Sequence, residues 1–413
     1  MRTVGRWLFA AIAGVVLASC GGHNEPPTPS IDVPTPTLES VTPSKTAQSP
    51  TLTRLAFVDK DRHIWTVDAA GLNKEKLFDV TPTKVSEFGT PEDFVGQLRW
   101  SPDGSKLAFN WNSELYIINA EGKEILRMAA GFVAWSPPGD RFIVSAVVKE
   151  SSHSCPSFSP TTTCEQFSAA QRVMDLARQV VIELPRTASN VSLSSDGDRV
   201  AFFDYVPGAY SDDGTLLVGR GMVAVVETGE LLPLDDGDPR AVRGNIVFSP
   251  SDPSLLAYGD RLINLGTREE RHLPAPVASW SPDGTKLLLG CGQVFDLATN
   301  SVVFEFQVGF PWDDYPLAVP GDCGPQLSRQ VVWSPDGQTL AAFDHFRYAD
   351  GWLRLMDIAT GEEQNVYQGP FGPPEFSPDG THLSFWSQGI WVVNSDGTGL
   401  VNVADGSDVA WQP

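Results

Sequence analysis

The chain contains 413 residues, 51 of them acidic and 29 basic, so its formal net charge at pH 7 is −22. This acidic excess argues against nucleic-acid binding and against electrostatic attachment to anionic lipid. Beyond the N-terminal segment, no apolar run is long enough to predict a transmembrane helix.

The N-terminal segment has the features of an export signal. Arg2 and Arg6 precede an apolar run, Trp7–Val16, that is too short for a stable membrane span. The run leads into Leu17–Cys20 (LASC), which resembles a bacterial lipobox. The resemblance implies cleavage before Cys20 and several acyl chains on that residue, enough for stable attachment. An ordinary signal peptide with a chance cysteine is the alternative. We expect residues 1–19 to be a lipoprotein signal peptide, and the mature protein to be lipid-anchored in the cell envelope, on the extracytoplasmic side of a membrane.

Residues 20–53 follow the signal and are rich in Pro, Thr and Ser, with few residues able to form a core. This composition predicts an extended, disordered tether. At about 3 Å per residue where it is polyproline-like, the tether could hold the folded domain tens of ångströms from the lipid.

A five-residue motif, Trp-Ser-Pro-Asp-Gly, organises the rest of the chain. It lies between apolar segments and predicts a strand, a tight turn and a second strand. Pro presets φ for the first corner of a type I turn, and Asp readily adopts the backbone conformation of the second corner. Gly supplies the left-handed residue that closes the hairpin. The aspartate is therefore assigned to turn formation and not to catalysis. The copies, from intact to degenerate, are Trp100–Gly104, Trp280–Gly284, Trp333–Gly337, Phe376–Gly380, Trp135–Gly139, Leu193–Gly197, Phe248–Pro253 and the partial Trp411–Pro413.

Each copy is followed by two further short strands, giving four strands per unit of about 45 residues, the period of a β-propeller blade. The segment Leu55–Asp79 has second, third and fourth strands but no first, whereas Val409–Pro413 is a first strand alone. Together they would complete one blade and close the ring without a free edge. The prediction for residues 54–413 is an all-β propeller of eight four-stranded blades. A missed degenerate blade or a split long one would change the count to seven or nine.

The repeated pattern resembles the TolB-type propeller repeat, which also occurs in the propellers of prolyl oligopeptidases and dipeptidyl peptidases. The resemblance covers nearly everything from Leu55 to Pro413 and implies blade architecture, with little information on function. Proteins of the TolB type have six blades and a separate N-terminal α/β domain, whereas this sequence shows more repeats, preceded by the tether. The peptidases carry an α/β-hydrolase domain with a G-x-S-x-G turn, which is also absent here. The resemblance therefore does not assign the function of TolB or the activity of the peptidases to this chain.

Four cysteines remain besides Cys20, an even number for an oxidising compartment. Cys155 and Cys164 lie in one Ser/Thr/Pro-rich segment and are predicted to form a disulfide, which leaves Cys291 to pair with Cys323. There is no C-x-x-C motif and no nearby pair of histidines, so we expect no metal site. No cofactor motif stands out either, and we expect no cofactor.

The predicted blade topology places all the long loops on one face of the ring. First-to-second and third-to-fourth turns would lie on one face and are uniformly tight. The long excursions would lie on the other: 80–96, 149–170, 205–221, 235–245, 309–330 and 343–351. Because loops on a rigid scaffold often carry function, that face is the candidate binding surface. Its acidic and aromatic candidates are Phe88, Phe94, Tyr205, Tyr210, Trp312, Asp313, Asp314, Tyr315, His345, Tyr348 and Trp352.

Two functions, which belong to different classes, are compatible with these features of the sequence. The first is a monomeric, non-enzymatic envelope lipoprotein whose propeller binds a partner, most plausibly a protein, with a sugar as another ligand suited to aromatic plates beside carboxylates. The second is an extracytoplasmic hydrolase or lyase acting on polysaccharide or peptide over the central channel. The second requires several His, Arg, Asp or Glu side chains from different blades to converge at the channel. No catalytic residue is assigned, and the alternative role for the aromatics is to fill gaps between blades.

Overall fold

The fold is given by a computed structural model. It describes residues 53–80, 95–112, 114–154, 163–210, 217–234, 240–241, 244–290, 292–306, 331–343, 351–369 and 372–413. The predicted signal peptide and all of the tether except Thr53 lie outside these residues. The described residues belong to one compact unit, 51–413.

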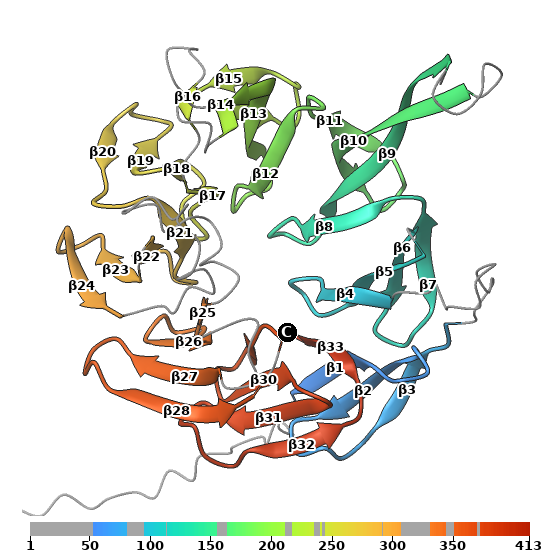
Figure 1. Cartoon of the computed structure of the whole chain (residues 1–413), viewed down its shortest axis with the longest axis vertical. Helices are drawn as coiled ribbons and strands as arrows, with labels where there is room; N and C mark the ends of the chain where they lie inside the picture. Colours follow the sequence, from blue (N-terminus) through green and yellow to red (C-terminus); the bar gives the residue numbers. More distant parts are fainter. Residues whose placement is uncertain are drawn as a thin grey trace, which may run out of the picture. The chain divides into compact units, whose positions relative to one another are not determined.

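Eight antiparallel sheets surround a central axis, and the first strand of each sheet lies innermost (Figure 1). We number the sheets as blades in chain order. Blade 1 contains β33 (Ser407–Trp411), β1 (Arg54–Val58), β2 (Ile64–Asp68) and β3 (Glu75–Phe78). Blade 2 contains β4 (Val95–Trp100), β5 (Lys106–Trp111), β6 (Glu114–Asn119) and β7 (Glu124–Met128). Blade 3 contains β8 (Gly131–Trp135), β9 (Arg141–Ser154), β10 (Thr163–Asp175) and β11 (Val180–Glu183). Blade 4 contains β12 (Ala188–Leu193), β13 (Arg199–Tyr210), β14 (Leu217–Val225), β15 (Leu231–Pro233) and a fifth strand, β16 (Arg240–Ala241).

The second half of the ring repeats the four-stranded pattern. Blade 5 contains β17 (Ile246–Phe248), β18 (Leu255–Tyr258), β19 (Arg261–Asn264) and β20 (Glu270–His272). Blade 6 contains β21 (Val277–Trp280), β22 (Lys286–Leu289), β23 (Gln293–Asp296) and β24 (Ser301–Glu305). Blade 7 contains β25 (Val331–Trp333), β26 (Thr339–Phe343), β27 (Trp352–Asp357) and β28 (Glu363–Gln368). Blade 8 contains β29 (Glu375–Phe376), β30 (His382–Trp386), β31 (Ile390–Asn394) and β32 (Val401–Ala404). Helix is absent from all the residues described.

The predicted eight-bladed propeller and its composite blade are confirmed. β33 pairs with β1 in antiparallel register, with Leu55 opposite Trp411 and Phe57 opposite Val409. Strands from the two ends of the propeller therefore share one sheet, and the inner edge of β1 is covered. Ring closure depends on this pairing.

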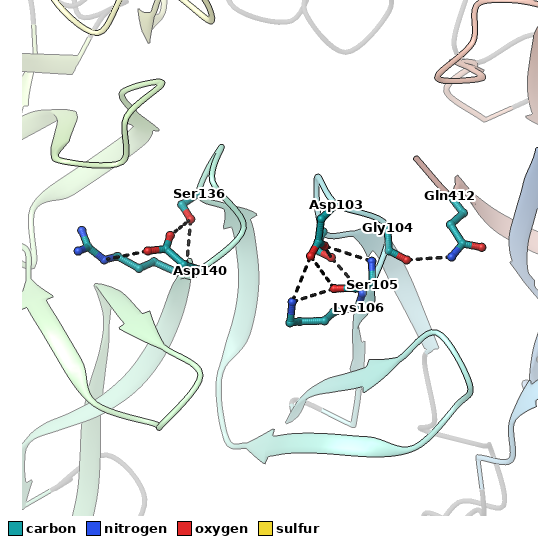
Figure 2. A network of polar contacts seen from close by, with 9 residues as sticks. Asp103, Gly104, Ser105, Lys106, Ser136, Asp140 and Gln412 are labelled. Atoms are coloured by element: carbon teal, nitrogen blue, oxygen red, sulfur yellow. Dashed lines mark hydrogen bonds and ion pairs between the residues drawn. The ribbon is translucent and has the colours of Figure 1, made fainter.

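The Trp-Ser-Pro-Asp-Gly motif forms the turn that its sequence predicts. In blade 6 the N–H of Gly284, at φ 73°, donates to the Ser281 carbonyl at 2.9 Å. The Ser281 hydroxyl is buried, accepts a hydrogen bond from the Lys286 N–H at 2.8 Å and donates to Asp283 at 2.6 Å. The same bonds recur in blade 2, where Asp103 also accepts from the Ser105 hydroxyl (Figure 2). The motif is thus a self-contained hydrogen-bonded turn.

Each turn also packs against the turn of the preceding blade. A Cβ placed on Gly139 would lie 3.4 Å from the Pro102 ring, and one on Gly197 would lie 3.5 Å from the Pro138 ring. At the composite blade, the Gln412 side-chain amide donates to the Gly104 carbonyl at 2.8 Å (Figure 2). The turns therefore form a belt on one face, which we call the turn face.

The motif tryptophans join neighbouring blades near the axis. Trp135 donates from Nε1 to the Arg99 carbonyl at 3.1 Å, and Trp280 donates to the Val247 carbonyl at 3.0 Å. In each case the acceptor is the residue just before the motif aromatic of the preceding blade. Apolar side chains fill the space between blades in eight clusters of buried residues, one for each blade junction.

The buried motif serine gives a testable stability contribution. Burial alone would raise the pKa of Asp283, but hydrogen bonds from Ser281 and Thr285 outweigh it and lower that pKa. A lowered pKa means that the contribution is present above the unfolded value and lost as pH falls through the folded value. We expect Ser281→Ala to cost about 1–2 kcal/mol at pH 7, and less below about pH 3, in denaturant unfolding. The exposed Ser301→Ala is the control and should stay within about 0.5 kcal/mol of wild type. Equal effects of the two substitutions would contradict the assignment.

Three segments predicted as loop excursions are partly strand, which corrects the sequence interpretation. In blade 3, β9 and β10 remain paired out to Ser154 opposite Thr163. In blade 4, β13 and β14 extend to Tyr210 opposite Leu217, and β16 pairs with β14. These segments lack strong apolar alternation, so their sequence predicts loop, although pairing between the two strands satisfies the backbone groups that face each other.

Candidate functional site

The two faces of the ring differ in how their connections are built. Turns between first and second strands, and between third and fourth strands, lie on the turn face and are short. The opposite face, here called the crossing face, carries the second-to-third loops and the passages between blades. Its longest connections are residues 79–94 between β3 and β4 and residues 306–330 between β24 and β25. The long connections therefore join strand ends on the predicted binding face.

Most of the predicted binding residues lie outside the described residues, namely Phe88, Phe94, Trp312, Asp313, Asp314, Tyr315, His345 and Tyr348. Tyr210 is described in its backbone only, at the end of β13. Tyr205 and Trp352 are described with their side chains. The proposed clustering of these aromatics on one surface remains a prediction.

Tyr205 occupies a packing position. Its ring centroid lies 6.0 Å from that of Phe203, and it is half-buried against the cluster between blades 4 and 5. Burial raises its pKa. Trp352 begins β27, lies opposite Gln368 and is also half-buried. Tyr205 thus fills a gap between blades, as the alternative interpretation of the aromatics expects, and any contact it makes with a ligand would be additional.

The disulfide predictions fall mostly outside the described residues. Cys155, Cys291 and Cys323 are not described, and Cys164 lies in β10 with His153 opposite it. Cys20 lies in the N-terminal segment that is also not described. The two pairings and the lipid attachment remain predictions.

The structure brings together charged side chains that sequence analysis did not single out. Arg99 lies in β4, Glu375 in β29 and Asp408 in β33, the innermost strands of blades 2, 8 and 1. Blade 1 lies between the other two, and its residue equivalent to Arg99 and Glu375, one position before the motif aromatic, is the small Ala410. The charge of Arg99 acts on both carboxyl groups. We call these three residues the channel cluster.

Asp408 bridges two innermost strands. It has φ 49° at a bulge in β33, and its Oδ2 accepts a hydrogen bond from the Leu98 N–H at 3.2 Å. Burial raises its pKa, although the backbone N–H of Leu98 and the charge of Arg99 oppose the shift. The carboxyl group therefore caps a backbone group on the inner edge of β4, which has no further strand beside it.

Glu375 of blade 8 makes a similar contact with the next blade, because it accepts hydrogen bonds from Trp411 of blade 1 as Asp408 of blade 1 accepts one from Leu98 of blade 2. Burial raises its pKa to about 7, despite the opposing effects of Arg99 and the Trp411 N–H. Its backbone carbonyl accepts a hydrogen bond from Trp411 Nε1 at 3.0 Å. Part of the residue surface remains exposed. A carboxyl group that titrates near neutral pH beside an arginine could transfer a proton or bind an anionic group with that arginine.

The sequence did carry a signal for these positions. Arg99 and Glu375 each precede the motif aromatic by one residue, and Asp408 precedes Trp411 by three. Equivalent positions in other blades hold uncharged side chains such as Ser192, whose hydroxyl accepts from the Phe248 N–H at 3.0 Å. Aligning the repeats on their aromatic residue would have exposed the charged exceptions.

Over the described ranges, no group of three His, Cys, Asp or Glu side chains is placed to hold a metal ion. Within the same ranges, no helix is long and apolar enough to cross a membrane.

Comparisons with known proteins give similarity at the level of fold. No family model and no curated protein matches the chain. A solved oligogalacturonate lyase in complex with manganese is 15% identical, covering 80% of this chain and 91% of its own, with a TM-score of 0.48. The C-terminal WD40 domain of Sif2 is 13% identical over 81% and 89% of the two chains, with a TM-score of 0.48. TolB from Acinetobacter baumannii is 15% identical over 85% and 79%, with a TM-score of 0.37. At this distance, none of them indicates a ligand or an activity.

Proposed function

We propose that this eight-bladed propeller is a lipid-anchored envelope protein that binds a protein partner through its crossing face. The observation that supports the proposal is the asymmetry between the two faces. The turn face is a belt of tight turns whose polar groups bond to one another. The crossing face carries every long connection, and a rigid ring that displays variable loops on one side is suited to recognition.

The proposal is tested by recovery of partners from native envelope membranes with the full chain as bait. One variant replaces residues 307–330 with a short Gly-Ser linker, and a matched control reverses two exposed turn-face charges, Glu121→Lys and Glu227→Lys. We expect the trimmed variant to lose at least about tenfold of partner recovery, and the control to stay within roughly twofold. Equal recovery by all three proteins would reject the crossing face as the binding surface.

Membrane attachment is proposed to depend on Cys20. Cys20→Ser removes the thiol that receives the lipid, so the protein should leave the membrane fraction or remain unprocessed. Fractionation and intact mass of the exported protein measure both outcomes. Unchanged attachment and unchanged mass would mean that another feature anchors the chain.

One observation favours a second candidate, an extracytoplasmic hydrolase or lyase acting on polysaccharide or peptide. Arg99, Glu375 and Asp408 lie on the innermost strands of three adjacent blades, and the charge of Arg99 acts on both carboxyl groups, which is the kind of grouping that this function requires. Under this alternative, Arg99 would bind a substrate carboxylate and Glu375 would exchange a proton with substrate. The rate at which products are formed from anionic polysaccharides would then be about 100-fold lower for Glu375→Gln than for wild type. An unchanged rate would leave the three residues as caps of strand edges.

A further inference from the structure

Blade 3 carries a two-stranded ribbon that extends beyond its own blade. β8 pairs with β9 only from Phe142 to Ser145, and β11 pairs with β10 only from Arg172 to Met174. From Ala146 outward, β9 pairs with β10 alone, as far as Ser154 opposite Thr163. Figure 1 shows the two strands running out past the rest of the blade. Within the described ranges, no third strand pairs with residues 146–154 or 163–170.

The neighbouring blade carries the same kind of ribbon with one edge covered. β14 extends beyond β15, which pairs only with residues Met222 to Ala224. β16 then pairs with the extension, with Ala241 opposite Val218 and Arg240 opposite Gly219. β14 and β10 are both third strands of their blades, and β16 lies on the same side of β14 as β15. The equivalent place in blade 3 is the edge of β10 beyond β11.

The backbone groups on that edge can be identified from the register. The Leu184 N–H donates to the Gln171 carbonyl at 2.9 Å, so the backbone of Gln171 points away from β9. In a strand, every second residue points to the same side. The register shifts between Gln166 and Phe167, but the extra residue, Glu150, lies in β9, so the alternation continues along β10. Residues 163, 165, 167 and 169 of β10 therefore direct their N–H and C=O groups outward. An extended edge of this kind is a template for another strand.

We propose that the β10 edge, residues 163–169, binds an extended segment of a protein partner as an added antiparallel strand, as β16 adds to β14. This inference rests on the proposed protein-binding function and specifies its mode. Main-chain hydrogen bonds would supply the contact. The segment must be free of proline over the paired residues, because each proline removes a donor. The net charge of −22 favours a segment with basic flanks.

The chain's own tether is a poor occupant of this edge. Prolines interrupt it at positions 26, 27, 29, 34, 36, 43 and 50. Such spacing favours a polyproline-like chain over a paired strand. A second copy pairing edge to edge through β10 is the competing occupant, and the experiment separates it from a foreign segment.

Two proline substitutions provide a matched test. Ala169 and Val147 lie opposite each other in the ribbon. The backbone groups of Ala169 point away from β9, and those of Val147, directly opposite, therefore point away from β10. Each proline thus removes one backbone donor, and the two donors lie on different edges of the ribbon. Only Ala169→Pro affects the proposed edge. Both variants are used as full chains, and their melting temperatures are compared first.

A photo-reactive phenylalanine analogue at Phe167 of the full chain, irradiated in native envelope membranes, identifies what lies on the edge. Mass mapping of the adduct defines the segment, and a synthetic peptide of that sequence becomes the binding probe. We expect an adduct with a different polypeptide, and peptide affinity at least about tenfold weaker for Ala169→Pro but within roughly twofold for Val147→Pro. In the wild-type chain, exchange of the Ala169 amide hydrogen should slow at least about tenfold when the peptide binds.

Each contrary result rejects the inference. An adduct with a second copy of the chain would make the edge a self-association surface. Equal weakening by both prolines, or unchanged exchange at Ala169, would show that the peptide binds elsewhere. If loop trimming abolishes partner recovery but no adduct forms at Phe167, the proposed function stands and the β10 mode is wrong. If neither experiment finds a partner, the proposed function fails with it.

Discussion

Deleting residues 409–413 should open the ring and lower the melting temperature by at least about 5 °C. These residues include Trp411, which is 3% exposed and packs among residues of blades 1 and 8. Losing a large buried aromatic side chain typically costs about 3–5 kcal/mol. The deletion also removes three side-chain hydrogen bonds between blades, from Trp411 Nε1 to Glu375, from Trp100 Nε1 to Ala410 and from the Gln412 amide to Gly104.

The deletion leaves the inner edge of β1 without a partner, so it should also promote association of the truncated protein. Calorimetry and light scattering measure the two effects. Trp411→Phe is the matched control, because it keeps most of the apolar side chain and removes the indole donor. We expect it to lower the free energy of unfolding by about 1 kcal/mol. A truncated protein with the same melting temperature as wild type would show that ring closure contributes little to stability.

The second large effect is a loss of stability as pH rises from about 4.5 to 7, caused by Glu375. Burial raises its pKa from 4.5 to about 7, and Arg99 and the Trp411 N–H only partly oppose this shift. For a carboxyl group with a raised pKa, the folded state binds the proton more tightly than the unfolded chain. Stability is therefore greatest below the unfolded pKa and declines until pH passes the folded pKa. The full penalty is about 3 kcal/mol, at about 1.4 kcal/mol per pKa unit.

The turn aspartates set the opposite limb of the profile. Hydrogen bonds from Ser101 and Ser105 lower the pKa of Asp103, and those to Asp379 outweigh burial and lower its pKa as well. Their contribution is present above about pH 4 and lost in acid. Together these groups predict maximal stability at acidic pH, between about 4 and 4.5.

Glu375→Gln tests the neutral limb directly. The amide cannot ionise, so the variant should match wild type near pH 4 and become more stable by up to about 3 kcal/mol at pH 8. Arg99→Gln should extend the wild-type decline to higher pH and enlarge the total loss, because it removes the charge that favours the carboxylate. Urea unfolding at a series of pH values measures both variants. Parallel profiles for wild type and Glu375→Gln would assign the pH dependence to other groups.

The sequence alone determined the architecture because the information is local and repeated. Trp-Ser-Pro-Asp-Gly fixes a turn through short-range bonds, such as those joining Ser281, Asp283 and Lys286. Its recurrence at blade spacing gave the number of blades. The unmatched strands Leu55–Val58 and Val409–Trp411 gave the ring closure that the register of β1 and β33 confirms. Each inference needed only neighbouring residues and a count.

The tertiary structure decided which residues meet across blades. Arg99, Glu375 and Asp408 are far apart in the chain and belong to three different repeats, so their proximity depends on the closed ring. The ribbon of blade 3 was equally hidden. Its two strands are held by hydrogen bonds between their facing backbone groups, and strand patterns in sequence report burial of side chains more than pairing of the backbone. The contacts between distant blades depend on closure of the ring, and the length of a paired hairpin depends on backbone hydrogen bonds, neither of which the pattern of side chains along the chain encodes.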